Sequence, residues 1–376
     1  MATAHSAEER PRPTGAAPTL GFVLAGVALA ASFLPWTGRP PLLGLGAAAG
    51  STVAAALALV ATVTFALRRY GLLDRRPASA VAGLGALGVT LVAGYRVVAP
   101  AMGGHGSPAI DWALPVAAVA AALAAVVSIA DWLAMPNDAV WTRVRGYVGA
   151  TALGLFAFVG ILVGQLLALP LLPMDAAWKY AVTMVLSYLG LIAFAVLYVT
   201  LRRGGLSYFD LSWPSLRDVA MVLVGFLGLL ALLIGVTQLF QQLGVPSSQP
   251  QLLEQADKYP ELALYLAVLS LVIVGPAEEL VYRNVVQKYL YDVFSPYAAI
   301  VAASTVFASV HVWQYADADP LATLNTLAVI FVLALVLGYT YYRSDNLVVP
   351  IAIHGSFNAM QFLVLYLQLT GRVPGQ

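Results

Sequence analysis

Long apolar stretches, separated by short polar ones, run along almost the whole chain. About 20 mostly apolar residues are needed for a helix to cross a bilayer. Eleven stretches approach or exceed that length, near residues 19–36, 43–67, 79–99, 111–134, 144–169, 176–201, 215–242, 260–291, 297–313, 321–342 and 347–369. The pattern therefore predicts an all-α fold, a polytopic transmembrane bundle of about eleven helices.

The same pattern divides the chain into three regions. Residues 1–18 are polar and lack the order of a cleavable signal, so we predict a disordered cytoplasmic tail. Residues 19–200 are predicted to be accessory transmembrane helices, in which small residues favour close packing in lipid. Residues 201–376 are predicted to hold the functional region, because their apolar helices contain Glu, His, Asn and Arg.

Composition excludes several classes of protein. The 376 residues are 61% hydrophobic and only 10% charged, so a water-soluble globule is excluded and the surroundings are a lipid bilayer. A net charge of +1 supplies no broad basic field, and we expect no nucleic-acid partner. The absence of cysteine excludes disulfides, thiolate metal sites and a cysteine nucleophile.

Basic residues gather in alternate loops, which indicates the orientation of the chain. If the amino terminus is cytoplasmic, most of the 19 Lys and Arg residues fall on the cytoplasmic side: Arg10, Arg12, Arg68, Arg69, Arg75, Arg76, Arg143, Arg145, Arg202, Arg203, Arg217, Lys288 and Arg343. The positive-inside rule therefore predicts a cytoplasmic amino terminus. With an odd number of helices the carboxyl terminus lies outside. We expect a multi-pass protein of the cell (plasma) membrane.

Two adjacent carboxylates interrupt an apolar helix in the last third of the chain. Nearly all of the 18 Asp and Glu residues lie in predicted loops or at helix ends, but Glu278 and Glu279 lie inside the stretch 260–291. A charge inside a membrane is costly, so an intramembrane ionisable group indicates a functional site by default. Arg283 lies four residues after Glu279, which is the spacing of an ion pair on one helix face.

Two of the four histidines also lie inside apolar stretches. His5 and His105 are in polar or Gly-rich segments, whereas His311 and His354 are in predicted helices. His354 and Asn358 are four residues apart, so their side chains share one face. A satisfied core histidine explains His311 as well as catalysis does, and a helix–helix hydrogen bond explains His354 and Asn358 nearly as well.

Together these residue types supply the parts of a hydrolytic site. A carboxylate can take a proton from water, a histidine can orient that water, shuttle a proton or bind a metal, and an Asn amide can donate to an oxyanion. Such a set would hydrolyse an amide bond. Neither GxSxG, SxxK nor HExxH is present, so we predict neither a serine nucleophile in a known setting nor a standard zincin site.

Three short motifs connect these residues with a known family. The segments EELVYR at 278–283, FASVH at 307–311 and HGSFN at 354–358 resemble the EExxxR, FxxxH and HxxxN/D motifs of the CPBP intramembrane proteases. That family includes the Rce1-like type II CaaX prenyl proteases and the Abi, or abortive-infection, proteins. The resemblance covers about residues 260–369. Asn284 and Tyr282 depart from the residues that many members carry there, and neither departure removes a proposed catalytic group.

The resemblance implies an intramembrane endopeptidase with a water-filled cavity that faces the cytoplasm. It implies that Glu278 activates water, that His311 positions the water or the glutamate, and that His354 and Asn358 stabilise the oxyanion. Glu279, Arg283 and Phe307 are then supporting residues.

The cofactor, the substrate and the class of activity stay open at this point. The resemblance allows either zinc, held by Glu278, His311 and His354, or a metal-independent glutamate mechanism with no cofactor. It implies a substrate that is a peptide or a protein C-terminus, which can itself be membrane-anchored. Two other classes remain: an ion-coupled transporter, disfavoured because no internal repeat is discernible, and a non-catalytic membrane interaction or immunity protein on a protease scaffold.

Overall fold

The computed structural model describes residues 15–34, 47–102, 113–171, 173–250, 252–315 and 320–373. His5 and His105 lie outside these ranges, as does most of the predicted tail. The first helix, α1 (Ala16–Ser32), begins inside the segment that was predicted to be a disordered tail up to residue 18. Residues 16–18 are helical and buried there, because Ala16 and Ala17 form an apolar cluster with Val140, against which Val127 and Met135 pack.

Over the described residues the fold is all-α, and each of the eleven predicted stretches holds a helix. Nine helices within the described ranges are long and apolar enough to cross a membrane by length and composition. The two helices Ala16–Ser32 and Pro296–Val310 are apolar but shorter. The predicted fold class, a polytopic helical bundle, is therefore confirmed.

The chain forms two compact units, which divide at Val144 and Arg145. The first unit contains α1, α2 (Ala47–Arg69), α3 (Arg75–Met102), α4 (Ala113–Trp132) and the first turns of α5 (Asn137–Leu167). The segment 243–245 is also assigned to it. This division does not test the predicted boundary between accessory helices (residues 19–200) and the functional region (residues 201–376), which stays a prediction.

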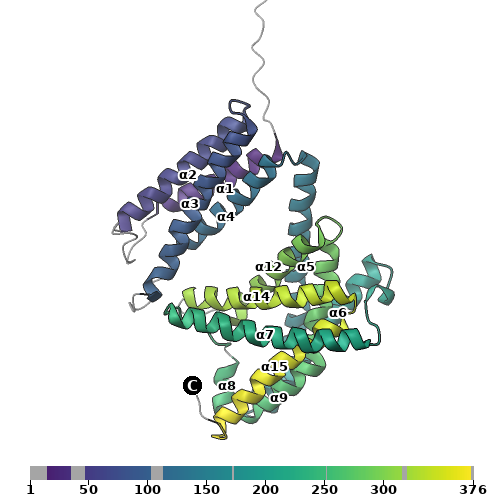
Figure 1. The fold of residues 1–376 in the computed structure, drawn as a ribbon. Coiled ribbons are helices and arrows are strands. Elements are labelled where there is room, and N and C mark those ends of the chain that lie inside the picture. The colour runs from purple at the N-terminus through teal and green to yellow at the C-terminus, as the bar shows by residue number, and fades with distance from the viewer. Residues whose placement is uncertain are drawn as a thin grey trace, which may run out of the picture. The chain divides into compact units, whose positions relative to one another are not determined.

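Helices α1 to α4 of the first unit pack side by side as a four-helix bundle (Figure 1). Alanine dominates the buried positions, for example Ala54, Ala93 and Ala117, all fully buried. Small side chains let helices approach closely, which is how helices associate in lipid. Asp131 at the end of α4 accepts hydrogen bonds from Ser79 at 2.6 Å and from Arg68 at 3.2 Å.

The second unit contains the remainder of the helices. They are the rest of α5, η1 (Leu169–Leu171), α6 (Trp178–Arg202), η2 (Leu206–Tyr208), α7 (Leu216–Gln242), α8 (Leu253–Lys258), α9 (Glu261–Leu269), η3 (Ser270–Val274), α10 (Gly275–Glu279), η4 (Leu280–Gln287), α11 (Lys288–Leu290), α12 (Pro296–Val310), α13 (Val312–Tyr315), α14 (Pro320–Ser344) and α15 (Val348–Leu369). Helix α7 packs against α14 and α15, and α15 also packs against α9 (Figure 1).

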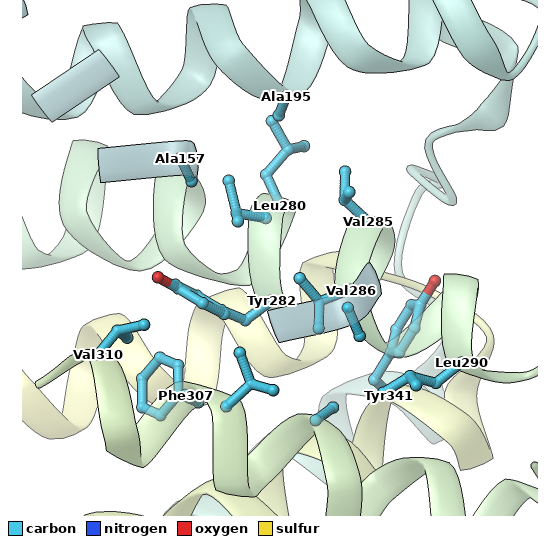
Figure 2. Packing of buried hydrophobic residues seen from close by; sticks show 14 of the residues in the cluster. Ala157, Ala195, Leu280, Tyr282, Val285, Val286, Leu290, Phe307, Val310 and Tyr341 are labelled. Atoms are coloured by element: carbon cyan, nitrogen blue, oxygen red, sulfur yellow. The ribbon is translucent and has the colours of Figure 1, made fainter. Parts of the chain in front are cut away.

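The core of the second unit surrounds η4. Every residue from Leu280 to Gln287 is buried, and α6, α10, α12 and α14 all pack on this segment. Figure 2 shows Leu280, Tyr282, Val285 and Val286 of η4 among residues from neighbouring helices. A helix that is buried all round lies at the centre of a bundle rather than against lipid.

Helices α5 and α6 approach each other through glycines of the sequence G-I-L-V-G. A Cβ atom on Gly160 would lie 2.2 Å from the carbonyl oxygen of Gly190, and one on Gly164 would lie 2.3 Å from that of Leu186. This GxxxG spacing is the pattern by which membrane helices bring their backbones into direct contact. The position of α6 therefore depends on these two glycines.

We expect Gly164→Ala to destabilise the protein by about 1–3 kcal/mol, because the added methyl group meets backbone atoms that cannot turn aside. The matched control is Gly228→Ala in α7, where nothing lies within 4 Å of an added Cβ. That control should change stability by less than about 1 kcal/mol. Chemical unfolding of the purified protein in detergent micelles measures both, and equal stabilities for the two variants would contradict the close contact.

Candidate active site

The two glutamates lie on a continuous helix that runs from Glu261 to Leu290. Within it, α10 carries Glu278 and Glu279 between two stretches of π-helical turns, η3 and η4. Wide π turns interrupt helices chiefly at functional sites, where they re-aim side chains. Pro276 follows η3. Proline has no backbone N–H, so one backbone hydrogen bond of the helix is missing there.

A contact between small residues brings α15 against this helix. A Cβ atom on Gly355 would lie 2.9 Å from the carbonyl oxygen of Ser270, and one on Gly275 would lie 3.2 Å from Cα of Gly355. Only glycine permits so close an approach of two backbones. Since His354 precedes Gly355, this contact carries its imidazole to the glutamates.

Glu279 is fully buried and held by two partners. Arg283 Nε donates to its Oε2 at 2.8 Å, so the ion pair predicted from the i, i+4 spacing is formed. The second partner is His354, whose Nδ1 lies 2.8 Å from Oε1 of Glu279. A carboxylate accepts hydrogen bonds, so Nδ1 of His354 carries a proton and Nε2 points away from Glu279.

Glu278 has different surroundings from its neighbour. Its Oε1 accepts a hydrogen bond from the hydroxyl of Tyr188 at 2.8 Å. Its Oε2 lies 3.7 Å from Nε2 of His354, too far for a direct hydrogen bond and close enough for both atoms to contact one water molecule. No Lys or Arg of the described chain pairs with Glu278. One carboxylate is thus neutralised by an arginine, and the adjacent one is not.

Tyr315 in α13 lies near the same carboxylate. Burial raises the pKa of Tyr315 to about 12, and the charge of Glu278 contributes to the rise. Its phenol therefore stays protonated at neutral pH and remains a hydrogen-bond donor.

Phe307 brings the two imidazoles into one neighbourhood. Its ring centroid lies 4.5 Å from that of His311 and 6.1 Å from that of His354. The Arg283 guanidinium lies 5.0 Å from the Phe307 centroid, a cation–π distance. Tyr282 meets the same ring edge-on, as Figure 2 shows. Phe307, which was predicted to be a supporting residue, thus packs among Arg283, Tyr282 and the two histidines.

His311 ends α12 with its ring in a defined orientation. Its Nδ1 lies 2.7 Å from the carbonyl oxygen of Phe307, and a carbonyl accepts, so Nδ1 carries a proton. In the neutral ring Nε2 is then an acceptor, with no hydrogen-bond partner in the described part of the chain. Asn358, one turn beyond His354 on α15, is partly buried, and its predicted role at the oxyanion stays a prediction.

Tyr188, like Tyr315, is a residue near Glu278 that the sequence did not point to. Tyr188 lies in α6, within the region predicted to be accessory, and contacts Glu278 directly. A single tyrosine in an apolar helix has no spacing or charge that distinguishes it from an interface residue. The sequence therefore contained no signal by which Tyr188 could have been found.

A second polar cluster lies on the same helix, closer to its end. Asp210, in the loop after η2, accepts hydrogen bonds from Lys288 at 2.7 Å, Asn284 at 3.2 Å and Tyr341 at 2.5 Å. The amide of Asn284 also donates to the Tyr341 hydroxyl at 3.0 Å. Asn284, a departure from the family pattern, thus helps to tie the loop to η4 and α14.

The predicted zinc ligands do not converge as a metal-binding set. No group of three His, Asp or Glu side chains in the described ranges is arranged to hold a metal ion. Glu279 and Nδ1 of His354 are already bound to each other, which leaves Glu278 and Nε2 of His354 as the nearest pair of donors. Zinc ligation by Glu278, His311 and His354 therefore stays a prediction.

Comparison with known proteins agrees with the motifs. Residues 260–360 match the family described as type II CAAX prenyl endopeptidase, Rce1-like. The matched range contains every predicted site residue, from Glu278 to Asn358, and the predicted resemblance is confirmed. Neither the curated proteins nor the solved structures gave a significant match to the chain. The match implies a protease, and a multi-pass membrane protein whose substrate is a peptide or protein.

We expect Arg283→Met to destabilise the protein by about 3–5 kcal/mol, because it leaves the buried Glu279 carboxylate without its cation. The double variant Glu279→Gln/Arg283→Met should recover part of that loss, since no unpaired charge remains. Arg202→Met, at an exposed arginine, is the control and should change stability by less than about 0.5 kcal/mol. Unfolding in detergent micelles measures the stability of all three variants. If Arg283→Met is as stable as the parent protein, the role of this pair is refuted.

Proposed function

We propose, from the match of residues 260–360 to the type II CAAX prenyl endopeptidases, that this protein is an intramembrane endopeptidase that hydrolyses a peptide bond with water activated by Glu278. The observation that carries the proposal is the unequal environment of the two glutamates. Glu279 is neutralised by Arg283, while Glu278 has only a tyrosine hydroxyl and the distant Nε2 of His354. Glu278 is thus the carboxylate left available to accept a proton.

In this mechanism the attacking water contacts two acceptors. Oε2 of Glu278 takes one of its protons, and Nε2 of His311 accepts a hydrogen bond from the other O–H. The oxygen lone pair is then directed at the substrate carbonyl. Two fixed acceptors orient a single water molecule toward the substrate carbonyl, which lowers the entropy cost of the attack.

The remaining groups act on the tetrahedral intermediate. The amide of Asn358 donates to the oxyanion that develops on the carbonyl oxygen. His354, with its Nδ1 proton held by Glu279, presents Nε2 to Glu278 and relays the proton toward the leaving amine. The C–N bond breaks as the amine takes that proton, and the new carboxyl group retains the oxygen of water. Glu279, Arg283 and Phe307 hold the other groups in place.

The proposed substrate is a peptide or a protein C-terminus close to the membrane. The family description names a prenyl endopeptidase that acts on CAAX sequences, and a prenylated chain is anchored in the bilayer by its lipid. The cavity is proposed to open to the cytoplasm, because Lys288 lies near the end of the glutamate helix and because Arg217 and Arg343 lie at the ends of α7 and α14. The proposed location is the plasma membrane.

Glu278 is the proposed general base, and its substitution tests the mechanism. Glu278→Gln should lower the rate of cleavage by roughly 10²–10⁴-fold, since an amide cannot take a proton from water. The assay uses the full-length protein in lipid vesicles and an internally quenched, farnesylated peptide that ends in a CAAX sequence. Asp292→Asn is the control, because that carboxylate is exposed and pairs with Arg203 outside the site. Unchanged cleavage by Glu278→Gln would refute the glutamate mechanism.

Because the chain has no native cysteine, single introduced cysteines can report how the chain is oriented in the membrane. Ser207 and Ser247 are exposed at opposite ends of α7, which at 27 residues is about 40 Å long. With a cytoplasmic amino terminus, Ser207→Cys should react with a membrane-impermeant maleimide only after the cells are opened. Ser247→Cys should react in intact cells. The reverse pattern would place the amino terminus outside.

A further inference from the structure

We propose that Tyr188 is a positioning residue for Glu278, and that helix α6 is therefore part of the catalytic unit. The proposal rests on the proposed function and extends it to a residue outside the range 260–360 that matches the family. It follows from two independent observations: a hydrogen bond at the glutamate, and a backbone contact that determines where α6 lies.

The hydrogen bond engages one of the two oxygens of Glu278. The Tyr188 hydroxyl donates to Oε1 at 2.8 Å, which is the usual distance for an O–H donor. The terminal torsion of a glutamate side chain is broad and roughly two-fold, so a free carboxyl group rotates readily. Because Oε1 is held, Oε2 is the oxygen presented to Nε2 of His354, 3.7 Å away. Tyr188 thus selects which oxygen accepts the proton.

The backbone contact places Tyr188 at that glutamate. The carbonyl groups of Leu186 and Gly190, which flank Tyr188 in α6, are those that approach Gly164 and Gly160 of α5. Such an approach leaves no room for α6 to slide or tilt at this level. On its other side α6 packs against α10 and η4, the segments around the glutamates. The residue between the two close contacts is therefore held at a fixed depth beside α10.

This arrangement differs from an ordinary buried tyrosine. A tyrosine hydroxyl buried only for packing commonly bonds to a backbone carbonyl, as Tyr282 does with Gly154 at 3.5 Å. Tyr188 instead bonds to Glu278, the carboxylate of the adjacent pair that has no arginine partner. A bond to a charged group is shorter and stronger than one between neutral groups. Its loss should therefore affect the orientation of Glu278 more than the stability of the fold.

The test compares Tyr188→Phe with Tyr180→Phe. Tyr180 lies on the same helix, is also partly buried, and donates to Gln255 at 2.6 Å away from the glutamates. Both variants are made in the full chain and assayed in lipid vesicles with the quenched, farnesylated CAAX peptide. Tyr188→Phe should lower kcat at least tenfold, because the carboxyl group of Glu278 is no longer held, while KM stays within error of the parent and the protein stays folded at the assay temperature. Tyr180→Phe should change kcat less than twofold.

An infrared measurement keeps this proposal separate from the proposed function. The carboxyl stretching band of Glu278 is identified by its disappearance in Glu278→Gln, and it should shift in Tyr188→Phe but not in Tyr180→Phe. If the parent protein cleaves nothing, the proposed function fails, while the band still decides whether Tyr188 holds Glu278. An unshifted band, or a kcat for Tyr188→Phe equal to that of Tyr180→Phe, would overturn the positioning role.

Discussion

The fully buried carboxylate of Glu279 is the group on which the rest of this site depends. It is removed from water, and a charge in such a place is tolerated only when partners of good geometry replace the lost hydration. Arg283 supplies the opposite charge from the same helix, and His354 supplies a hydrogen bond from α15. These two contacts join α10, η4 and α15. They also fix the direction in which the imidazole of His354 faces, and so leave Glu278 as the carboxylate without an arginine.

The contacts that bring these helices together are made by backbone rather than by large side chains. Lipid gives no hydrophobic driving force between helices, so close packing of small residues takes its place. Gly355 allows α15 to touch the glutamate helix at Ser270, and Gly164 allows α5 to touch α6 at Leu186. One contact positions His354 and the other positions the tyrosine of α6. The carboxyl oxygens of Glu278 are thus approached from two helices, each held at a set depth by glycine.

The two compact units differ in how their interiors are built. The first unit buries mostly alanine, and Asp131 in it accepts hydrogen bonds from Arg68 and Ser79. The second unit buries branched aliphatic and aromatic side chains around η4 and contains every predicted site residue. Helices α5 and α6 supply part of this second unit although their composition resembles that of the segments before them. The boundary between the two compact units therefore does not coincide with residue 200, where the sequence analysis placed the end of the accessory helices.

Local sequence was sufficient for the all-α class, for the eleven apolar segments and for the ion pair of Glu279 with Arg283. These depend on the length of apolar runs and on an i, i+4 spacing, which are properties of neighbouring residues. The meeting of the two glutamates with His354 was also foreseeable, because polar groups in apolar helices have few favourable places except beside one another. Only the folded chain decided that His354 bonds to Glu279, 75 residues away, and that Tyr188 bonds to Glu278, 90 residues away. Such pairings arise from the depth and the contact face of each helix, which backbone packing sets and no local pattern encodes.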